Sequence, residues 1–244
     1  MNVKTAVRTL DLFETFAREG RPLPLSELGR LLAIPVSSCF ALVQTLQNRG
    51  YIYEVQRRSG YYPTRRLQAV AEQIAASDPL LDRIRPTLLE LRDQTGETAV
   101  VGKLQDARVL YLDVAESQQR IRYIASIGEF RQPHANSLGK ALLAALPQGE
   151  RARLLKDYDW TAPTPRTLSS PAAFEREMEA ITQRGWAVNA GESVADLAAV
   201  ACALRLNRDW YAISVAGPLY RMEPHLAAYG EMLRAACATL TDES

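Results

Sequence analysis

Glycine and proline divide the first 63 residues into segments that are each long enough for only one short helix or one hairpin strand. The segment boundaries fall at positions 20, 22, 24, 35, 50 and 63, whereas Gly29 and Gly60 lie inside segments. Within the segments 6–17, 26–32 and 36–49, apolar residues recur every three or four positions, which is the period of an amphipathic helix. This spacing predicts three short helices, each ended by the glycine or proline that follows it.

A β-prone run follows the third predicted helix. Residues 51–63, YIYEVQRRSGYYP, place aromatic residues on both sides of the polar turn QRRSG. The pattern predicts a hairpin with Arg57 and Arg58 at its tip, ended by Pro63. Three short helices and a basic hairpin describe a winged helix-turn-helix, in which the third helix enters the DNA major groove, about 12 Å wide, and the hairpin contacts the phosphate backbone.

The third helix carries the candidate base contacts. Its inward stripe contains Cys39, Leu42, Val43 and Leu46. The outward residues are Ser37, Ser38, Phe40, Ala41 and Gln44. Hydroxyl groups can bond phosphates or base edges, apolar groups can meet a thymine methyl, and a glutamine amide can read adenine. The hairpin residues Arg57 and Arg58 would add affinity that does not depend on base sequence.

The distribution of charge also favours a polyanion near the N-terminal end. Residues 1–77 hold ten Lys and Arg against six Asp and Glu, whereas the remainder holds 19 against 22. A basic excess confined to one segment is expected where only that segment touches nucleic acid. The pattern alone leaves open a small helical subdomain that never binds DNA.

Beyond residue 64 the chain alternates helical and β-prone segments. Residues 65–76 have a modest apolar stripe that ends at Ser77-Asp78-Pro79, which predicts a linker helix. The β-prone runs are residues 97–104, 107–115, 120–126, 185–193, 198–206 and 210–217. The first three runs are separated by short polar turns and favour an antiparallel meander. Strands interleaved with helices predict an α+β fold.

Composition argues against several kinds of site. Cys39, Cys202 and Cys237 are odd in number and far apart, so neither a disulfide framework nor a metal site is expected. No apolar run approaches the roughly 18 residues that a membrane-spanning helix needs. Asp11 and Glu14 interrupt the first apolar pattern, so we expect no signal peptide. We expect a cytoplasmic protein with no cofactor and no membrane contact.

One local pattern is also found in enzymes. Ser137 and Lys140 form an S-x-x-K spacing, which in serine acylases brings a lysine close to the serine nucleophile. The SDN and KTG motifs that accompany it are absent from the sequence, and His134 has no partner in a recognisable order. We therefore assign no catalytic residue, and expect Ser137 to cap a helix and Lys140 to be solvated or to contact an anion.

Five segments, in their order and spacing, resemble the IclR family of bacterial transcriptional regulators. The first is residues 10–52, LDLFETFAREGRPLPLSELGRLLAIPVSSCFALVQTLQNRGYI. The others are TGETAVVGKLQDARVLYLD, GEFRQPHANSLGKALLA, RGWAVNAGES and AISVAGP. Each segment is weak evidence alone, but together they cover nearly the whole chain.

The resemblance implies a ligand-responsive regulator of a catabolic operon. Its parts would be a winged helix-turn-helix over 1–64, a linker helix over 65–78, and a GAF-like domain with an antiparallel sheet over 79–244 for effector binding and oligomerisation. The implied partners are double-stranded operator DNA, a small-molecule effector, and further copies of the chain in a dimer or a dimer of dimers. A sensor or scaffold that keeps the fold without binding DNA is the alternative.

The chain departs from the family pattern at both implied sites. Val36 and Ala41 stand where the family often has basic residues, so guanine readout by arginine is lost there. The positions that match effector-binding residues of the family are Asn136, Ser137, Leu138, Asn189, Ala199, Ser214 and Ala216. Ala199 and Ala216 replace a cysteine and a serine, which predicts a less polar pocket for a larger effector such as an aromatic acid.

Overall fold

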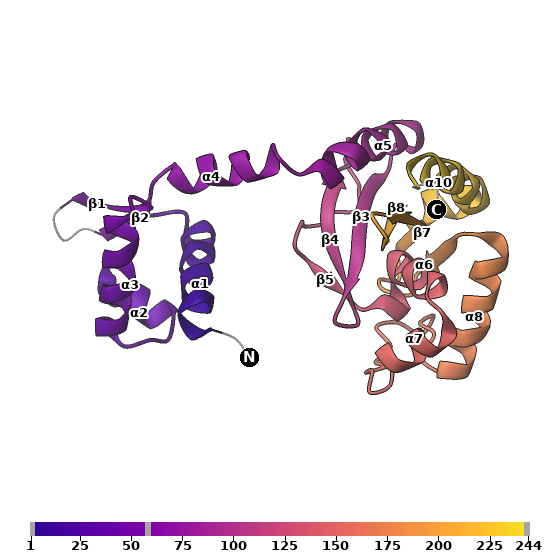
Figure 1. Cartoon of the computed structure of the whole chain (residues 1–244), viewed down its shortest axis with the longest axis horizontal. Coiled ribbons are helices and arrows are strands. Elements are labelled where there is room, and N and C mark those ends of the chain that lie inside the picture. Colours follow the sequence, from indigo (N-terminus) through magenta and orange to yellow (C-terminus); the bar gives the residue numbers. More distant parts are fainter. Residues whose placement is uncertain (1–2, 57–59, 242–244) are drawn as a thin grey trace. The chain divides into compact units, whose positions relative to one another are not determined.

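The computed structural model describes residues 3–56 and 60–241. The chain forms two compact units, Met1–Asp78 and Pro79–Ser244 (Figure 1). Within the described ranges, no single helix is long and apolar enough to cross a membrane, although the bent pair Leu25–Leu31 and Val36–Asn48 reaches that length and apolarity when taken together.

Three helices and a two-stranded hairpin begin the first unit. They are α1 (Lys4–Glu19), α2 (Leu25–Leu31), α3 (Val36–Asn48), β1 (Ile52–Gln56) and β2 (Gly60–Pro63). α1 ends at Gly20, whose φ of 63° is a left-handed conformation that glycine adopts without strain. β1 and β2 are antiparallel, and Leu23 and Tyr61 exchange backbone hydrogen bonds that join the hairpin to the turn before α2. This is the winged helix-turn-helix that the sequence predicts.

The core of the first unit draws on one side of each helix. Its buried apolar residues are Leu12, Phe16, Leu23, Leu28, Cys39, Val43, Leu46 and Ile52. Cys39, Val43 and Leu46 recur at helical spacing along α3, so this helix turns one side to the core and the opposite side to solvent. Burial of each large apolar side chain stabilises the unit by about 1.5–3 kcal/mol.

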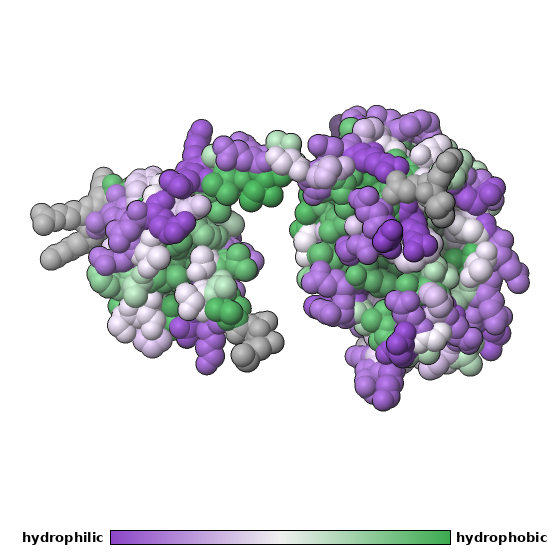
Figure 2. Space-filling view, viewed as in Figure 1, coloured by the Kyte–Doolittle hydropathy of each residue, from purple (hydrophilic) through white to green (hydrophobic). Residues whose placement is uncertain are grey.

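The predicted linker segment forms α4 (Arg66–Ala75), a helix with no buried residue. Its start is held to the first unit, because the Thr64 amide donates to the Tyr51 carbonyl at 2.8 Å and the Arg66 guanidinium lies 5.2 Å from the Tyr51 ring centre. Ile74 is well exposed, and Figure 2 shows a hydrophobic strip along one side of α4. The segment is therefore an amphipathic helix whose apolar stripe faces solvent.

A six-stranded antiparallel sheet forms the frame of the second unit. Its strands are β3 (Thr98–Gln105), β4 (Arg108–Ala115), β5 (Phe130–Arg131), β6 (Ala187–Ala190), β7 (Leu197–Leu206) and β8 (Asp209–Pro218), in the spatial order β5-β4-β3-β8-β7-β6. The helices are α5 (Pro79–Thr95), α6 (Ser137–Ala145), α7 (Gln148–Leu154), α8 (Pro171–Arg184), α9 (Leu219–Met222) and α10 (Leu226–Leu240), with 3₁₀ turns at Pro133–Ala135 and Glu223–His225. Strands interleaved with helices give the predicted α+β fold.

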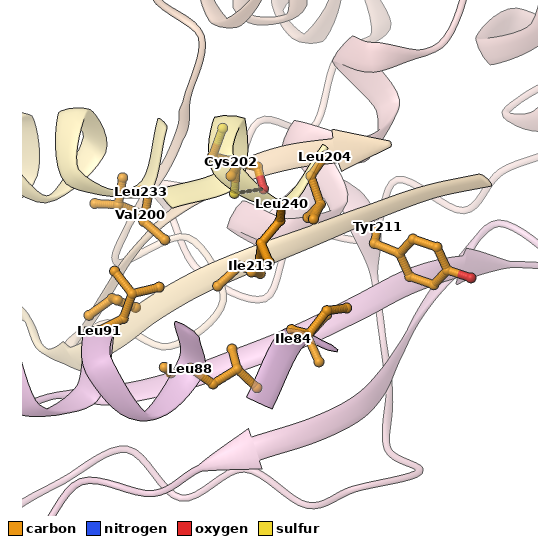
Figure 3. Close-up of a cluster of buried hydrophobic side chains, with 14 of the residues drawn as sticks. Ile84, Leu88, Leu91, Val200, Cys202, Leu204, Tyr211, Ile213, Leu233 and Leu240 are labelled. Atoms are coloured by element: carbon orange, nitrogen blue, oxygen red, sulfur yellow. Dashed lines mark hydrogen bonds between the residues drawn. The ribbon is translucent and has the colours of Figure 1, made fainter. Parts of the chain in front are cut away.

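Alternate residues of the central strands pack on opposite faces of the sheet. One face packs against α5 and α10 (Figure 3), and its core includes Ile84, Leu88, Leu91, Val200, Cys202, Ile213, Leu233, Cys237 and Leu240. The other face packs against α6 and α8, and its core includes Val100, Leu138, Leu142, Phe174, Met178, Ala201 and Ala212. The sheet therefore has helices on both faces, and α5 and α10 together cover the first.

The prediction that residues 120–126 form the third strand of a meander is wrong. Residues 120–126 have no strand structure, and the edge position beside β4 is taken by β5, which pairs Phe130 with Leu110 and Arg131 with Val109. The segment is instead tied to the sheet by a side chain, because the Thr98 hydroxyl donates to the Tyr123 carbonyl at 2.7 Å. β-Propensity reflects a fit to a half-buried surface and does not decide which run occupies an edge.

Candidate functional site

The outward side of α3 has the exposure that the sequence predicts. Ser37, Phe40, Ala41 and Gln44 are exposed, and Ser38 is half-buried beside the core. Phe40 is 44% exposed, so part of its apolar ring is accessible on this side of the helix. The helix contains no charged residue, so its outward side offers hydroxyl, amide and apolar groups only.

The hairpin that flanks α3 is only partly described. Arg57 and Arg58, the predicted phosphate contacts, lie outside the described residues. On the strands beside them, Tyr53 and Val55 are exposed on β1. α3 and the hairpin belong to the same compact unit, so one contact surface can include both.

A cavity of about 350 Å³ lies in the second unit, between the sheet and the loop that leads into α6. Six of the seven predicted effector residues line it: Asn136, Ser137, Asn189, Ala199, Ser214 and Ala216. The side chain of the seventh, Leu138, does not line the cavity, because it is buried in the core between α6 and the sheet. Position 138 is the second residue of α6, and its side chain points toward α8 and the sheet rather than toward the loop.

Small side chains on neighbouring strands form the floor of the cavity. Ala199 of β7 lies opposite Ala216 of β8, and Asn189 of β6 lies opposite Ala199. Ser214 is two residues from Ala216 on the same strand, so both side chains stand on the same face of the sheet. Because two of these four side chains are single methyl groups, the floor leaves space where larger residues would fill it.

The start of α6 forms one wall. Asn136 caps the helix, its side-chain oxygen accepting from the Gly139 amide at 3.3 Å. A side chain at Gly139 would lie 2.3 Å from Pro133, so glycine alone permits the loop to pass this close to the helix. The amides of Ser137 and Leu138 belong to the first turn, whose N–H groups the helix itself does not satisfy. These two amides and the helix dipole favour an anion at this wall.

The Asn189 side chain bonds to neighbouring parts of the chain, so its amide is not free for a ligand. Its Nδ2 donates to the Ala135 carbonyl at 3.1 Å and to the Ser193 hydroxyl at 2.8 Å, which uses both hydrogens. Its Oδ1 accepts from the Glu192 amide at 2.8 Å. Asn189 therefore joins the loop before α6 to the turn after β6.

Lys140 contacts an anion, which is one of the two outcomes expected for it, but that anion is a carboxylate of the same chain and Lys140 is only 1% exposed. Its ammonium donates to Glu192 Oε1 at 2.6 Å and lies 4.0 Å from Glu177. Burial raises the pKa of the Glu192 carboxyl, against the opposing effect of Lys140. Asn136, and not Ser137, caps α6. The Lys140 ammonium is therefore held in a buried ion pair. Ser137 and Lys140 do not form the open cleft that a serine acylase needs.

Several cavity residues were not predicted from the sequence, among them Tyr111, Tyr123 and Arg131. Asn136 Nδ2 donates to the Tyr111 hydroxyl at 2.8 Å, and the Tyr123 hydroxyl lies 3.4 Å from that of Tyr111. Burial raises the pKa of Tyr111, so its hydroxyl stays protonated. Arg131 bonds Glu129 at 2.7 Å, but its Nε is buried with no hydrogen-bond partner. The strand alternation that places Tyr111 on the same face as Val109 could have flagged the tyrosine, whereas Arg131 gave no signal.

His134 is held in place by its neighbours. Its ring is fully buried, with Nδ1 2.7 Å from the Tyr158 hydroxyl and Nε2 3.1 Å from the Thr161 carbonyl. Burial lowers the pKa of His134 and raises that of Tyr158 to about 12. The carbonyl requires a proton on Nε2, so a neutral ring accepts from Tyr158 through Nδ1. Within residues 3–56 and 60–241, no three His, Cys, Asp or Glu side chains form a cluster suited to a metal ion.

Two family models match the sequence of this two-part chain. The model of the C-terminal region of bacterial transcriptional regulator IclR matches residues 72–241, and the IclR helix-turn-helix model matches residues 5–56. The first match alone covers more than half of the chain. The chain belongs to the IclR family. It is a ligand-responsive, DNA-binding transcriptional regulator, and the resemblance seen in its sequence is confirmed.

Individual relatives agree with this assignment to the IclR family. The transcriptional repressor IclR of Escherichia coli is 27% identical over 98% of this chain and 89% of its own length. The crystal structure of Thermotoga maritima IclR is 20% identical, with a TM-score of 0.81 and 98% of both chains covered. An IclR homologue from Microbacterium hydrocarbonoxydans, complexed with 4-hydroxybenzoate, is 22% identical, with a TM-score of 0.77 and 97% of both chains covered. The two structures confirm the α+β fold.

Proposed function

We propose that this IclR-family protein controls a catabolic operon in response to a small organic acid with an aromatic or otherwise apolar body. The observation that carries this proposal is a cavity whose described lining residues include one arginine, Arg131, and no carboxylate, with a floor that includes Ala199 and Ala216. The arginine and the start of α6 suit a carboxylate, and the methyl floor suits an apolar body. The 4-hydroxybenzoate held by the Microbacterium homologue is an acid of this kind, which adds support.

The direct test is calorimetry with a panel of acids on the full-length protein. We expect benzoate and 4-hydroxybenzoate to bind more tightly than acetate, pyruvate or glyoxylate. Arg131→Gln should weaken the aromatic acids about tenfold or more, because a charge-assisted hydrogen bond is lost. Arg120→Gln, an exposed position that does not line the cavity, is the matched control. Tighter binding of a two- or three-carbon acid than of any aromatic acid would contradict the proposal.

We propose that Ser37, Ser38, Phe40, Ala41 and Gln44 read the operator and that Arg57 and Arg58 bind its phosphates. An uncharged α3 supports readout by amide and apolar contacts, which match adenine and the thymine methyl. Arg57→Ala with Arg58→Ala should weaken binding to every sequence and lower the salt slope by about two. Gln44→Ala or Ser38→Ala should instead change the preference among sequences. If the arginine pair changed preference and left the salt slope intact, these roles would be wrong.

We assign DNA binding to residues 1–64, coupling to 65–78, and sensing and oligomerisation to 79–244. Two recognition helices about 34 Å apart fit successive turns of a duplex, so we propose a homodimer or a dimer of dimers. The effector would shift the equilibrium between two spacings of these helices. It can do so only to the extent that it binds the two arrangements with different affinity. This role would be carried out in the cytoplasm. Sedimentation with and without operator measures the assembly, and a monomer on DNA would contradict it.

We propose no enzymatic activity, since Lys140 is paired with Glu192 and His134 with Tyr158. The neutral surface of α3 keeps one alternative open, namely a sensor that retains the fold without binding DNA. A mobility shift on DNA upstream of the chain's own gene separates the two. A shift reversed by an acid that binds the cavity supports the regulator, and no shift on any genomic fragment supports the sensor.

A further inference from the structure

We propose that the natural effector is an amphiphilic acid, whose carboxylate lies in the cavity beside Arg131 and whose apolar tail lies in a neighbouring groove. This groove is lined chiefly by Ile121, Ile124, Leu219 and Tyr220, and has a volume of about 720 Å³. The proposal rests on the effector role of the cavity and narrows its ligand class from small acids to acids with an extended apolar chain.

The groove and the cavity adjoin each other. Tyr123, Val194 and Leu197 line both of them, so a ligand that extends from the cavity past these three residues would enter the groove. The cavity alone, at about 350 Å³, is near the lower end of the range of small-molecule sites, which is about 300–1,000 Å³. The larger volume therefore lies outside the cavity, along the direction that an extended ligand would take.

The walls of the groove are apolar and exposed to solvent. Ile121, Ile124 and Tyr220 are each 65% exposed, and Val194 is 55% exposed. Four large apolar side chains around one concave surface form the kind of exposed patch that marks a ligand or partner site in soluble proteins. An alkyl chain or an arylalkyl chain would cover them without needing any hydrogen bond.

Charge decides which end of the ligand enters which space. Asp196 and Glu223 are carboxylates on the groove lining, and Arg122, its cation, is already paired with Glu116. A ligand carboxylate would be repelled there, whereas the described lining of the cavity includes Arg131 and no carboxylate. The acid group therefore belongs in the cavity and the uncharged chain in the groove. A second copy of this chain is the other occupant that the test considers, and the three lining residues that the groove shares with the cavity favour the ligand tail.

The test is a series of straight-chain acids, from butanoate through hexanoate and octanoate to decanoate, each below its micelle concentration. Calorimetry on the full-length protein should give an affinity that rises about two- to fourfold per added methylene group, since a buried methylene contributes up to about 0.8 kcal/mol. Octanol, which lacks the carboxylate, should bind at least tenfold more weakly than octanoate. An affinity that is flat from butanoate to decanoate would overturn the proposal.

Two isoleucine variants separate the groove from general surface effects. Ile124→Asn should remove most of the chain-length dependence and leave butanoate binding within about twofold of wild type. Ile127→Asn is the matched control, because Ile127 is 64% exposed on the same segment but does not line the groove. Equal effects of the two variants would overturn the proposal. So would a smaller assembly in sedimentation with Ile124→Asn together with unchanged octanoate affinity, since a second copy would then be the occupant.

The design also distinguishes failure of this inference from failure of the effector role. If butanoate binds and releases the protein from DNA but longer acids do no better, only the amphiphilic ligand is wrong. If no acid binds, or if bound acids leave DNA affinity unchanged, the effector role proposed for the cavity fails, and this inference fails with it.

Discussion

The two faces of the six-stranded sheet use neighbouring residues of the same strands for different purposes. On β8, Val215 points into the core with α5 and α10, while Ser214 and Ala216 point to the cavity. The first face is closely packed with branched side chains, and the second keeps small ones beneath an open volume. Strand alternation thus lets a single strand contribute to stability on one side and line the proposed effector cavity on the other. Mutations at adjacent positions should separate the two.

Lys140→Met is expected to have the largest effect and to limit this contrast, because a buried ion pair on the cavity side also contributes to stability. Removal of Lys140 leaves Glu192 buried without its partner, which should cost about 3–5 kcal/mol of unfolding free energy. All three tryptophans, Trp160, Trp186 and Trp210, lie in the second unit, so their fluorescence during urea unfolding reports on it alone. The double variant with Glu192→Leu should recover most of the loss. A single variant as stable as wild type would mean that the pair is not buried in solution.

Val215→Ala and its neighbour Ala216→Ile should have opposite effects on stability and binding. Val215 is fully buried against α5 and α10, so its truncation should lower unfolding free energy by about 1–3 kcal/mol and leave ligand affinity unchanged. Ala216→Ile fills the floor and should weaken acid binding tenfold or more, with about 1 kcal/mol or less of change in stability. Urea unfolding and calorimetry on both variants measure this. If the two variants changed unfolding free energy and acid affinity in the same way, the contrast between the two faces would be contradicted.

Acidification should destabilise the second unit through His134. Burial lowers the pKa of its ring, so the unfolded chain takes up a proton at a higher pH than the folded chain does. Stability is therefore lost as pH falls below about 6.5, by at most about 1.4 kcal/mol per pH unit. Burial raises the pKa of Glu192, so its contribution runs the other way, and stability is lost as pH rises above the ordinary value of 4.5. His134→Gln should remove only the first effect, and identical pH profiles for variant and wild type would contradict it.

The first unit could be predicted closely because its signals are local. Gly20 and Gly50 stand just after the helices that end before them, Pro35 stands just before α3, and the period of α3 shows which side is inward. In the second unit the same approach placed the long strands but misassigned residues 120–126. Those residues have a suitable composition for a strand, yet the edge of the sheet belongs to Phe130 and Arg131. Occupancy of an edge depends on the path of the whole chain, which composition does not encode.

The cavity was only partly predictable. Asn136, Ser214 and Ala216 came from the resemblance to the family, and no local pattern marked them. Lys140 was expected to be solvated or to contact an anion, but its partner Glu192 could not be named, because it is 52 residues away and nothing near Lys140 in the sequence indicates burial. Arg131 has the same difficulty, since an arginine beside Glu129 is usually a surface ion pair.

The facing pair Ala199 and Ala216 also matters for how such a protein could be retuned. Both residues are held by the backbone ladder between β7 and β8, so exchange of either side chain leaves that ladder intact. Adding carbon atoms at these two positions would reduce the depth of the cavity with little disturbance of the sheet. A library restricted to this pair would be a compact starting point for building biosensors that answer to different acids.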